Sequence, residues 1–123
     1  MTKGQLEAKI GNEILKFHIN QLGRGAESVK TYIVDDMIII RLTSVLTPAE
    51  KQLAATEHGK HLIKELRYEL EEIIRKDIEC LIQELTELTV LSIHNDISTK
   101  TGERVDIIIL NKNLEEILIK NSV

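Results

Sequence analysis

Two pairs of β-rich segments constrain the fold of this chain more than any other feature of its sequence. In the first pair, SVKTYIV (28–34) and MIIIRLTSV (37–45) are separated only by Asp35 and Asp36, and a two-residue connection is typical of a β-hairpin. Residues 37–40 are all apolar, as in strands that are covered on both sides or buried in a subunit interface. The sequence therefore predicts a hairpin whose second strand is central in a sheet.

A second hairpin is predicted closer to the C-terminal end. TVLSIHND (89–96) and RVDIIILN (104–111) are joined by a short polar segment. Its hydroxyl residues can cap free backbone amides, and Gly102 can occupy a left-handed turn position. A phosphate-binding loop of the Walker type needs Gly-x-x-x-x-Gly-Lys-Ser/Thr, whereas Lys100 here precedes Gly102. We therefore interpret residues 98–103 as a hairpin connection.

Three stretches carry helical signals. Apolar residues recur at helical spacing over residues 5–22, and the glycines of LGRG (22–25) suit the end of a helix. TPAE (47–50) combines a capping box with a proline at the first helical position, which predicts a helix that starts at Pro48. LEEILIK (114–120) predicts a short final helix.

The long segment between the hairpins is predicted to form an amphipathic helix with interruptions. We expect a pause at Gly59 and a bend or break at RKD (75–77), where the apolar spacing slips. The apolar stripe before that point comprises Leu62, Leu66, Leu70, Ile73 and Ile74. We interpret this stripe first as core against the sheet, with a partner face or a dimer interface as the alternative.

The resulting order, α-ββ-α-α-ββ-α, indicates a single domain over residues 1–123 of the α+β class. We expect an antiparallel sheet of two hairpins, about four strands, with helices packed on one face. A chain of 123 residues with 42% apolar residues can bury a core without disulfides or metals. Because one helical layer leaves the other face of such apolar strands uncovered, we also expect a homodimer.

Charge and composition argue against several kinds of partner. Sixteen Lys and Arg residues against 20 Asp and Glu give a formal net charge of −4, and the chain has one Phe, two Tyr and no Trp. Neither attraction to nucleic acid nor base stacking is therefore favoured. The single Cys80, which we expect to be buried, excludes an internal disulfide and fits a reducing cytoplasm. Neither export nor a membrane span is predicted.

The candidate reactive groups fall short of a complete site. His58 and His61 in HGKH could share a helix face and offer two nitrogens to a metal ion, but no third ligand occurs in a recognisable motif. The adjacent Asp35 and Asp36 are more typical of an exposed turn than of a cation site. No nucleophile elbow and no Gly-x-Gly-x-x-Gly motif is present. The residues therefore predict neither an enzyme nor a bound cofactor or metal ion.

Three long strings resemble, in the same order, the MpsC-like family of small bacterial proteins. They are TKGQLEAKI, GRGAESVKTYIVDDMIIIRLTSVLTPAEKQLA and HNDISTKTGERV, and the resemblance covers nearly all of residues 2–115. The family name implies association with a Na+-translocating, membrane-potential-generating system that also bears on inorganic-carbon uptake. The ion-handling subunits of such systems are other, membrane-embedded chains. The resemblance therefore implies a cytoplasmic accessory protein, peripheral to the inner membrane through its partners.

The resemblance supplies no catalytic residues, but it suggests a ligand or partner surface. The candidates are Arg24, Asp35, Asp36, Arg41, His94, Asp96, Lys100 and Arg104. The first hypothesis is a non-enzymatic accessory or regulatory protein that contacts membrane-embedded ion or bicarbonate transport subunits. The alternative is a small-anion or nucleotide sensor, or an enzyme with an unrecognised loop-built site, in which Arg24, His94 and the 96–104 loop converge.

Overall fold

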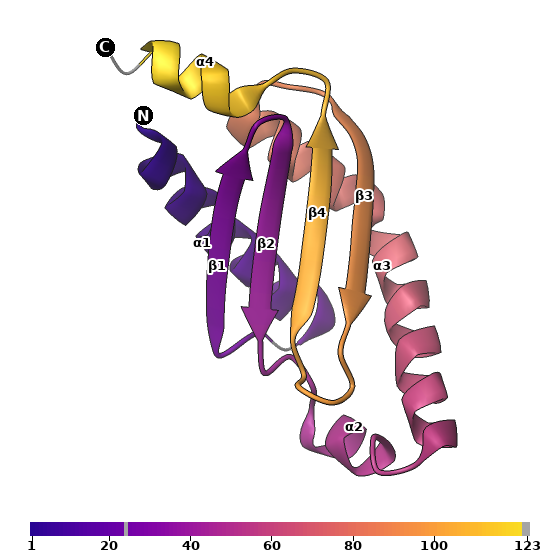
Figure 1. The fold of residues 1–123 in the computed structure, drawn as a ribbon. Helices are drawn as coiled ribbons and strands as arrows, with labels where there is room; N and C mark the ends of the chain where they lie inside the picture. The colour runs from indigo at the N-terminus through magenta and orange to yellow at the C-terminus, as the bar shows by residue number, and fades with distance from the viewer. Residues whose placement is uncertain (24, 122–123) are drawn as a thin grey trace.

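The computed structural model describes residues 1–23 and 25–121 of the chain. Its helices and strands follow the predicted order α-ββ-α-α-ββ-α (Figure 1). They are α1 (Lys3–Leu22), β1 (Ser28–Val34), β2 (Met37–Thr43), α2 (Pro48–Leu53), α3 (Glu57–Thr86), β3 (Val90–Ile97), β4 (Arg104–Leu110) and α4 (Leu114–Asn121). The α+β class predicted from the sequence is confirmed.

The four strands form one antiparallel sheet in the order β1-β2-β4-β3. Asp35 and Asp36 connect β1 to β2 in a tight turn, in which Asp35 adopts the left-handed φ of 54°. β2 also pairs with β4, with Ile39 opposite Ile107, so that the two hairpins join into a continuous sheet. β2 is therefore a central strand, as its all-apolar run predicted.

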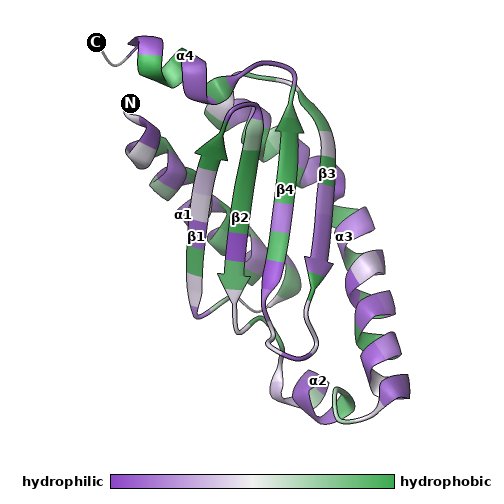
Figure 2. Ribbon diagram, in the orientation of Figure 1, coloured by the Kyte–Doolittle hydropathy of each residue, from purple (hydrophilic) through white to green (hydrophobic). Residues whose placement is uncertain are grey.

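The sheet carries its helices on one face. In the view of Figure 1, α1 and α3 cross behind the strands, and no helix lies in front of them. Ile38, Ile40 and Ile108 are fully buried and belong to the same core cluster as Ile10 and Ile14 of α1. Figure 2 shows the corresponding apolar bands on the strands and on the helical layer. The predicted one-sided packing is confirmed.

The helix that begins at Pro48 is short. Thr47 and Glu50 form the predicted capping box. Residues 54–56 then separate α2 from α3, because Thr56 caps a new helix by accepting a hydrogen bond from the amide of Gly59. The pause predicted at Gly59 therefore falls just before it, and Gly59 itself lies in the first turn of α3.

α3 runs without interruption through residues 75–77, so of the bend or break predicted there the break does not occur. A helix of 30 residues is about 45 Å long, whereas a strand of eight residues reaches only about 26 Å. α3 therefore extends well past the end of the sheet, and its other end curves behind the strands (Figure 1). None of the helices within residues 1–23 and 25–121 is long and apolar enough to cross a membrane.

The apolar stripe predicted on α3 is partly wrong as well. Leu62, Leu66 and Ile73 are exposed by 41%, 51% and 75%. Ile74 of the predicted stripe does face the core, and it is joined there by Gly59, Ile63, Glu71, Ile78 and Ile82. Cys80, predicted to be buried, is also exposed because it lies off this core-facing row. The misassignment arises because the apolar residues of α3 lie on two neighbouring faces, of which only one meets the sheet.

Candidate functional site

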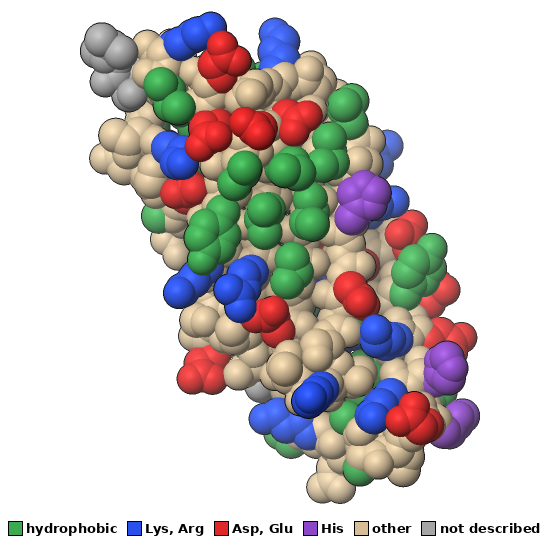
Figure 3. Space-filling model, viewed as in Figure 1, with side chains coloured by type: hydrophobic (Ala, Val, Ile, Leu, Met, Phe, Trp, Pro, Cys, Tyr) green, Lys and Arg blue, Asp and Glu red, His purple; other side chains and the backbone are tan. Residues whose placement is uncertain are grey.

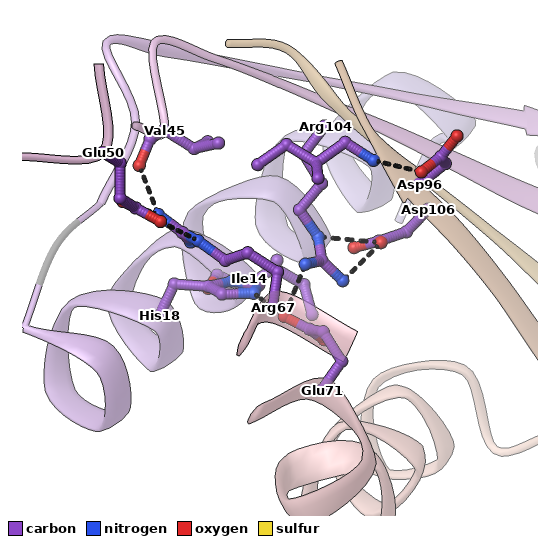
Figure 4. Close-up of polar contacts among 10 residues, drawn as sticks. Ile14, His18, Val45, Glu50, Arg67, Glu71, Asp96, Arg104 and Asp106 are labelled. Atoms are coloured by element: carbon purple, nitrogen blue, oxygen red, sulfur yellow. Dashed lines mark hydrogen bonds and ion pairs between the residues drawn. The ribbon is translucent and has the colours of Figure 1, made fainter. Parts of the chain in front are cut away.

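Arg104, the first residue of β4, turns its side chain toward the helices and is only 3% exposed. Its Nη1 lies 2.6 Å from Oε1 of Glu71 on α3. Its Nη2 and Nε lie 2.9 Å and 3.0 Å from Oδ1 of Asp106. Residues two apart on a strand point to the same face, which is why Arg104 and Asp106 meet on the inner side of the sheet (Figure 4).

His18 of α1 completes this arrangement. Its Nδ1 lies 3.0 Å from the carbonyl oxygen of Ile14, and its Nε2 lies 3.5 Å from Oε1 of Glu71. The carbonyl can only accept, so Nδ1 must donate a hydrogen, while Nε2 faces a carboxylate. The doubly protonated ring is the form that offers a donor to both neighbours.

We call His18, Glu71, Arg104 and Asp106 the buried ionic cluster, because all four residues are buried. The single guanidinium of Arg104 faces two carboxylates, so the charges balance when His18 is protonated. Charges removed from water are tolerated only when they are paired and hydrogen-bonded. The cluster therefore ties α1, α3 and β4 together at a point where the core would otherwise be aliphatic.

The two carboxyl groups of the cluster have pKa values shifted in opposite directions. Burial acts to raise the pKa of Glu71, but the hydrogen bond from His18 and the charge of Arg104 outweigh it, so this pKa falls below its ordinary value. At Asp106 the effect of burial is larger than the attraction of Arg104, and the pKa is raised.

A second buried ion pair lies beside the cluster (Figure 4). Arg67 of α3 donates from Nε to Oε2 of Glu50 at 2.8 Å and from Nη2 to Oε1 at 2.6 Å. The same Nη2 donates to the carbonyl oxygen of Val45 at 2.8 Å. Burial acts to raise the pKa of Glu50, but hydrogen bonds from Arg67 and Thr47 outweigh it and lower the pKa. The pair fastens α2 and the segment before it onto α3.

The residues predicted to form one ligand or partner surface are divided between the two faces of the sheet. Arg104 points to the inner face of the sheet. Arg41 and His94 lie opposite Val105 and Ile107 of β4, which alternate with Arg104 and therefore point to the outer face. The convergence of His94 with the whole 96–104 loop, which the alternative hypothesis required, is not found.

The remaining predicted residues lie at the two ends of the sheet. Asp35 and Asp36 form the β1–β2 turn at one end. Asp96 lies at the other end, 3.3 Å from Nζ of Lys64 on α3, and Lys100 is exposed in the β3–β4 connection. Arg24 lies outside the described residues.

An apolar area lies open on the outer face of the sheet, with charged side chains and a histidine around it (Figure 3). By strand register, side chains on this face form successive rows across β1, β2, β4 and β3. The apolar members of these rows are Tyr32, Val34, Met37, Ile39, Val105, Ile107 and Ile109. We call this surface the open sheet face. Tyr32 and Val34 are exposed by 41% and 39%.

Sequence reasoning missed His18, Glu50, Arg67, Glu71 and Asp106. A sequence signal exists for His18 and Asp106, because these two polar residues occupy positions that the periodicity assigns to the core. His18 follows Ile14 by one helical turn. Asp106 shares its strand face with Ile108, which is fully buried. Such buried polar residues need partners, but the sequence does not reveal which elements supply them.

A surface depression of about 520 Å³ lies next to the buried ionic cluster. Its lining includes His61, Lys64, Arg67, Asp96 and Arg104, so it is formed by α3, β3 and β4. Within the described part of the chain, no three His, Cys, Asp or Glu side chains are grouped to hold a metal ion. His58 and His61 both point to solvent.

Comparison with known proteins gives a consistent result. The family model described as "Na+-translocating membrane potential-generating system (MpsC)" matches residues 2–112. The uncharacterized protein YbcI of Bacillus subtilis (strain 168) is 41% identical over 121 residues, which cover 95% of this chain and 98% of YbcI. No solved structure matches the chain.

Proposed function

Because the chain belongs to the MpsC family, we propose that it is a non-enzymatic accessory or regulatory protein of a Na+-translocating, membrane-potential-generating system. In this role it would work in the cytoplasm and contact membrane-embedded ion or bicarbonate transport subunits. The observation that carries the proposal is the family match over residues 2–112. No substrate pocket is required for such a role, only surfaces that a partner recognises.

α3 offers a surface suited to such a partner. Leu62, Leu66 and Ile73 form an apolar strip outside the core-facing row, and Leu66 and Ile73 are at least half exposed. Part of this helix extends beyond the sheet (Figure 1). An exposed helical strip with apolar residues at this spacing is the surface that helix-in-groove recognition uses. We therefore place the contact with the transport subunits on this strip.

Affinity purification from bacterial membranes tests the proposal directly. The tagged protein is expected to recover a membrane-embedded transport subunit, and deletion of its gene is expected to change membrane potential and growth at low carbon dioxide. Leu66→Asp should abolish the recovery, because it places a charge in the apolar contact. Leu91→Asp, which alters a similarly exposed leucine on β3, is the matched control. Unchanged physiology together with no recovered subunit would refute the proposal.

A second candidate function, small-anion or nucleotide sensing, is favoured by the depression beside the buried ionic cluster. Lys64, Arg67 and Arg104 all line it, although each already contacts a carboxylate. A thermal-shift series with bicarbonate, phosphate and nucleotides tests this function, because a ligand selective for the folded state raises Tm by mass action. A shift that Lys64→Met removes would support sensing, and flat melting curves for every anion would exclude it.

A further inference from the structure

The open sheet face has an ordered pattern of side chains. One row contains Val34, Met37 and Ile109, and the next contains Tyr32, Ile39 and Ile107. In the following row, Lys30 and Arg41 stand beside Val105 and Asp96. The acidic turn of Asp35 and Asp36 lies past the other end. The apolar field is thus bounded at one end by the acidic turn and at the other by Lys30 and by Arg41, whose Nη2 lies 2.6 Å from Oε2 of Glu103. Figure 3 shows charged side chains beyond both ends of the field.

The whole open sheet face, with its polar positions included, approaches the size of a small interface. Strands seven residues long, with four strands about 4.8 Å apart and a rise of about 3.3 Å per residue, give a flat face of about 450 Å². Two such faces would bury about 900 Å² in total. This flat estimate leaves out the surrounding loops and the extra area of protruding side chains, and specific interfaces start at about 1,200 Å² of buried surface. Contiguous apolar patches of several hundred Å² on soluble domains mark interaction sites.

The charges at the two ends identify the occupant. Lys30, Asp35 and Asp36 form no ion pair within the described chain, although Lys30 shares a strand with the apolar residues. Consider a two-fold axis that lies in the plane of the face and runs perpendicular to the strands. A half-turn about this axis brings the acidic end of one copy over the basic end of the other, so the surface is complementary to itself. Such self-complementarity defines an isologous dimer interface. A second copy of the same chain therefore matches both the apolar field and its borders.

We propose that the protein forms a homodimer in which two open sheet faces pack on each other about this perpendicular two-fold axis. β1 then lies over β1 of the second copy, Tyr32 packs near Val34, and Ile39 packs near Met37. Lys30, which has no ion pair within the described chain, lies opposite the Asp35–Asp36 turn of the second copy. The two sheets form an aligned sandwich about 10 Å thick. This inference does not depend on the proposed role in ion transport.

A two-fold axis parallel to the strands is the competing arrangement. It would place β1 over β3 of the second copy and Lys30 opposite Asp96. Asp96 already pairs with Lys64, and this arrangement leaves Asp35 and Asp36 away from the basic end. Electrostatic complementarity determines the orientation of two partners more strongly than their affinity. We therefore favour the perpendicular axis, which brings Lys30 to the acidic turn of the second copy.

Sedimentation equilibrium on the full chain tests the dimer. We expect a dimer at micromolar concentration for the wild type and monomers for Ile39→Asp and Val34→Asp. Val34 lies on an exposed edge strand, so its substitution leaves the monomer fold intact, as circular dichroism would verify. Ile73→Asp places the same change on an exposed position of α3 and should remain dimeric. A monomeric wild type, or a dimer insensitive to both sheet substitutions, would overturn the proposal.

Charge reversal tests the axis. Lys30→Glu and Asp36→Lys should each raise the dimer dissociation constant about tenfold, and the double variant should restore it, because rim charges act in pairs across the axis. Asp36 is chosen since Asp35 adopts a left-handed φ, in which lysine is strained. Rescue of Lys30→Glu by Asp96→Lys in place of Asp36→Lys would overturn the perpendicular axis.

Discussion

At the scale of single residues, the unusual feature of this protein is ionised side chains inside an isoleucine-rich core. Arg104 holds two carboxylates, from Glu71 and Asp106, while His18 approaches Glu71 from α1. Desolvation makes such a cluster a weak source of net stability, yet removal of one member is strongly destabilising because it leaves an unpaired buried charge. The cluster therefore adds little to the net free energy of unfolding, but it strongly restricts which side chains are tolerated at its four positions.

Substitution of Arg104 should reveal this dependence. Arg104→Met is expected to lower the free energy of unfolding by about 3–5 kcal/mol, because Glu71 and Asp106 lose their shared counter-charge. Lys64→Met, which removes only the exposed ion pair with Asp96, should change it by less than about 1 kcal/mol. Urea unfolding followed by circular dichroism measures both. Equal effects of the two variants would show that the buried pairs carry no special weight.

Acid stability should depend on the pairing of Glu50 with Arg67. Folding lowers the pKa of Glu50, so its contribution is complete above the unfolded pKa of about 4.3 and is lost as the pH falls through the folded pKa. Glu50→Gln should therefore reduce the slope of unfolding free energy against pH below about pH 5. Glu84→Gln, at an exposed position of α3, is the control. Identical slopes for wild type and Glu50→Gln would contradict the assignment.

Asp106 should act in the opposite direction. Its raised pKa means that the folded protein binds this proton more readily than the unfolded chain, so the associated stabilisation is present at acid pH and is lost as the pH rises through the folded pKa. Protonation at low pH therefore favours the folded state through Asp106 and disfavours it through Glu50 and Glu71. The measured slope of unfolding free energy against pH is the sum of these opposing contributions.

At the scale of elements, α3 explains two errors of sequence interpretation. It is longer than the sheet is tall, so one part of it has no strand to pack against, and Leu62 and Leu66 are left exposed. Its core-facing row also includes Glu71, which periodicity alone does not assign to the core. The apparent slip near residues 75–77 reflects this change of packing along one continuous helix.

The junction between α2 and α3 should be sensitive to a single methyl group. A Cβ at Gly59 would lie 1.7 Å from the carbonyl oxygen of Leu53, whereas nothing lies within 4 Å of a Cβ at Gly4 in α1. Gly59→Ala should therefore destabilise the fold, although alanine favours helices by about 1 kcal/mol over glycine. Gly4→Ala should stabilise it by up to about 1 kcal/mol. Thermal unfolding distinguishes the two, and stabilisation by both would contradict the close packing.

At the scale of the whole molecule, one helical layer covers one face of the sheet, and the outer face is the one on which we propose that a second copy packs. If this dimer forms, folding and association are linked, so Tm should rise with protein concentration. The concentration dependence should disappear in Ile39→Asp and persist in Ile73→Asp. Calorimetry across a range of protein concentrations measures it. A wild-type Tm independent of concentration would contradict the linkage.

The candidate surface shows how far sequence reasoning reaches. The candidate residues Asp35, Asp36 and Arg41 were selected from the family resemblance, whereas the hairpin that carries them was predicted from local turn and strand signals. Their assembly into one site was not predictable, since it depends on which face each strand presents. His94 and Arg104 were placed in one surface, yet they lie on opposite faces of the sheet.

The sequence by itself determined the order of elements, both hairpins, the capped helix start at Pro48 and the family. These features depend on interactions within a few residues, such as the capping box of Thr47 and Glu50 and the turn at Asp35 and Asp36. Only the tertiary structure decided the pairing of β2 with β4, the assembly of the buried ionic cluster and the outward orientation of Leu62 and Leu66. These depend on contacts between segments far apart in the chain, which periodicity and local propensity do not encode.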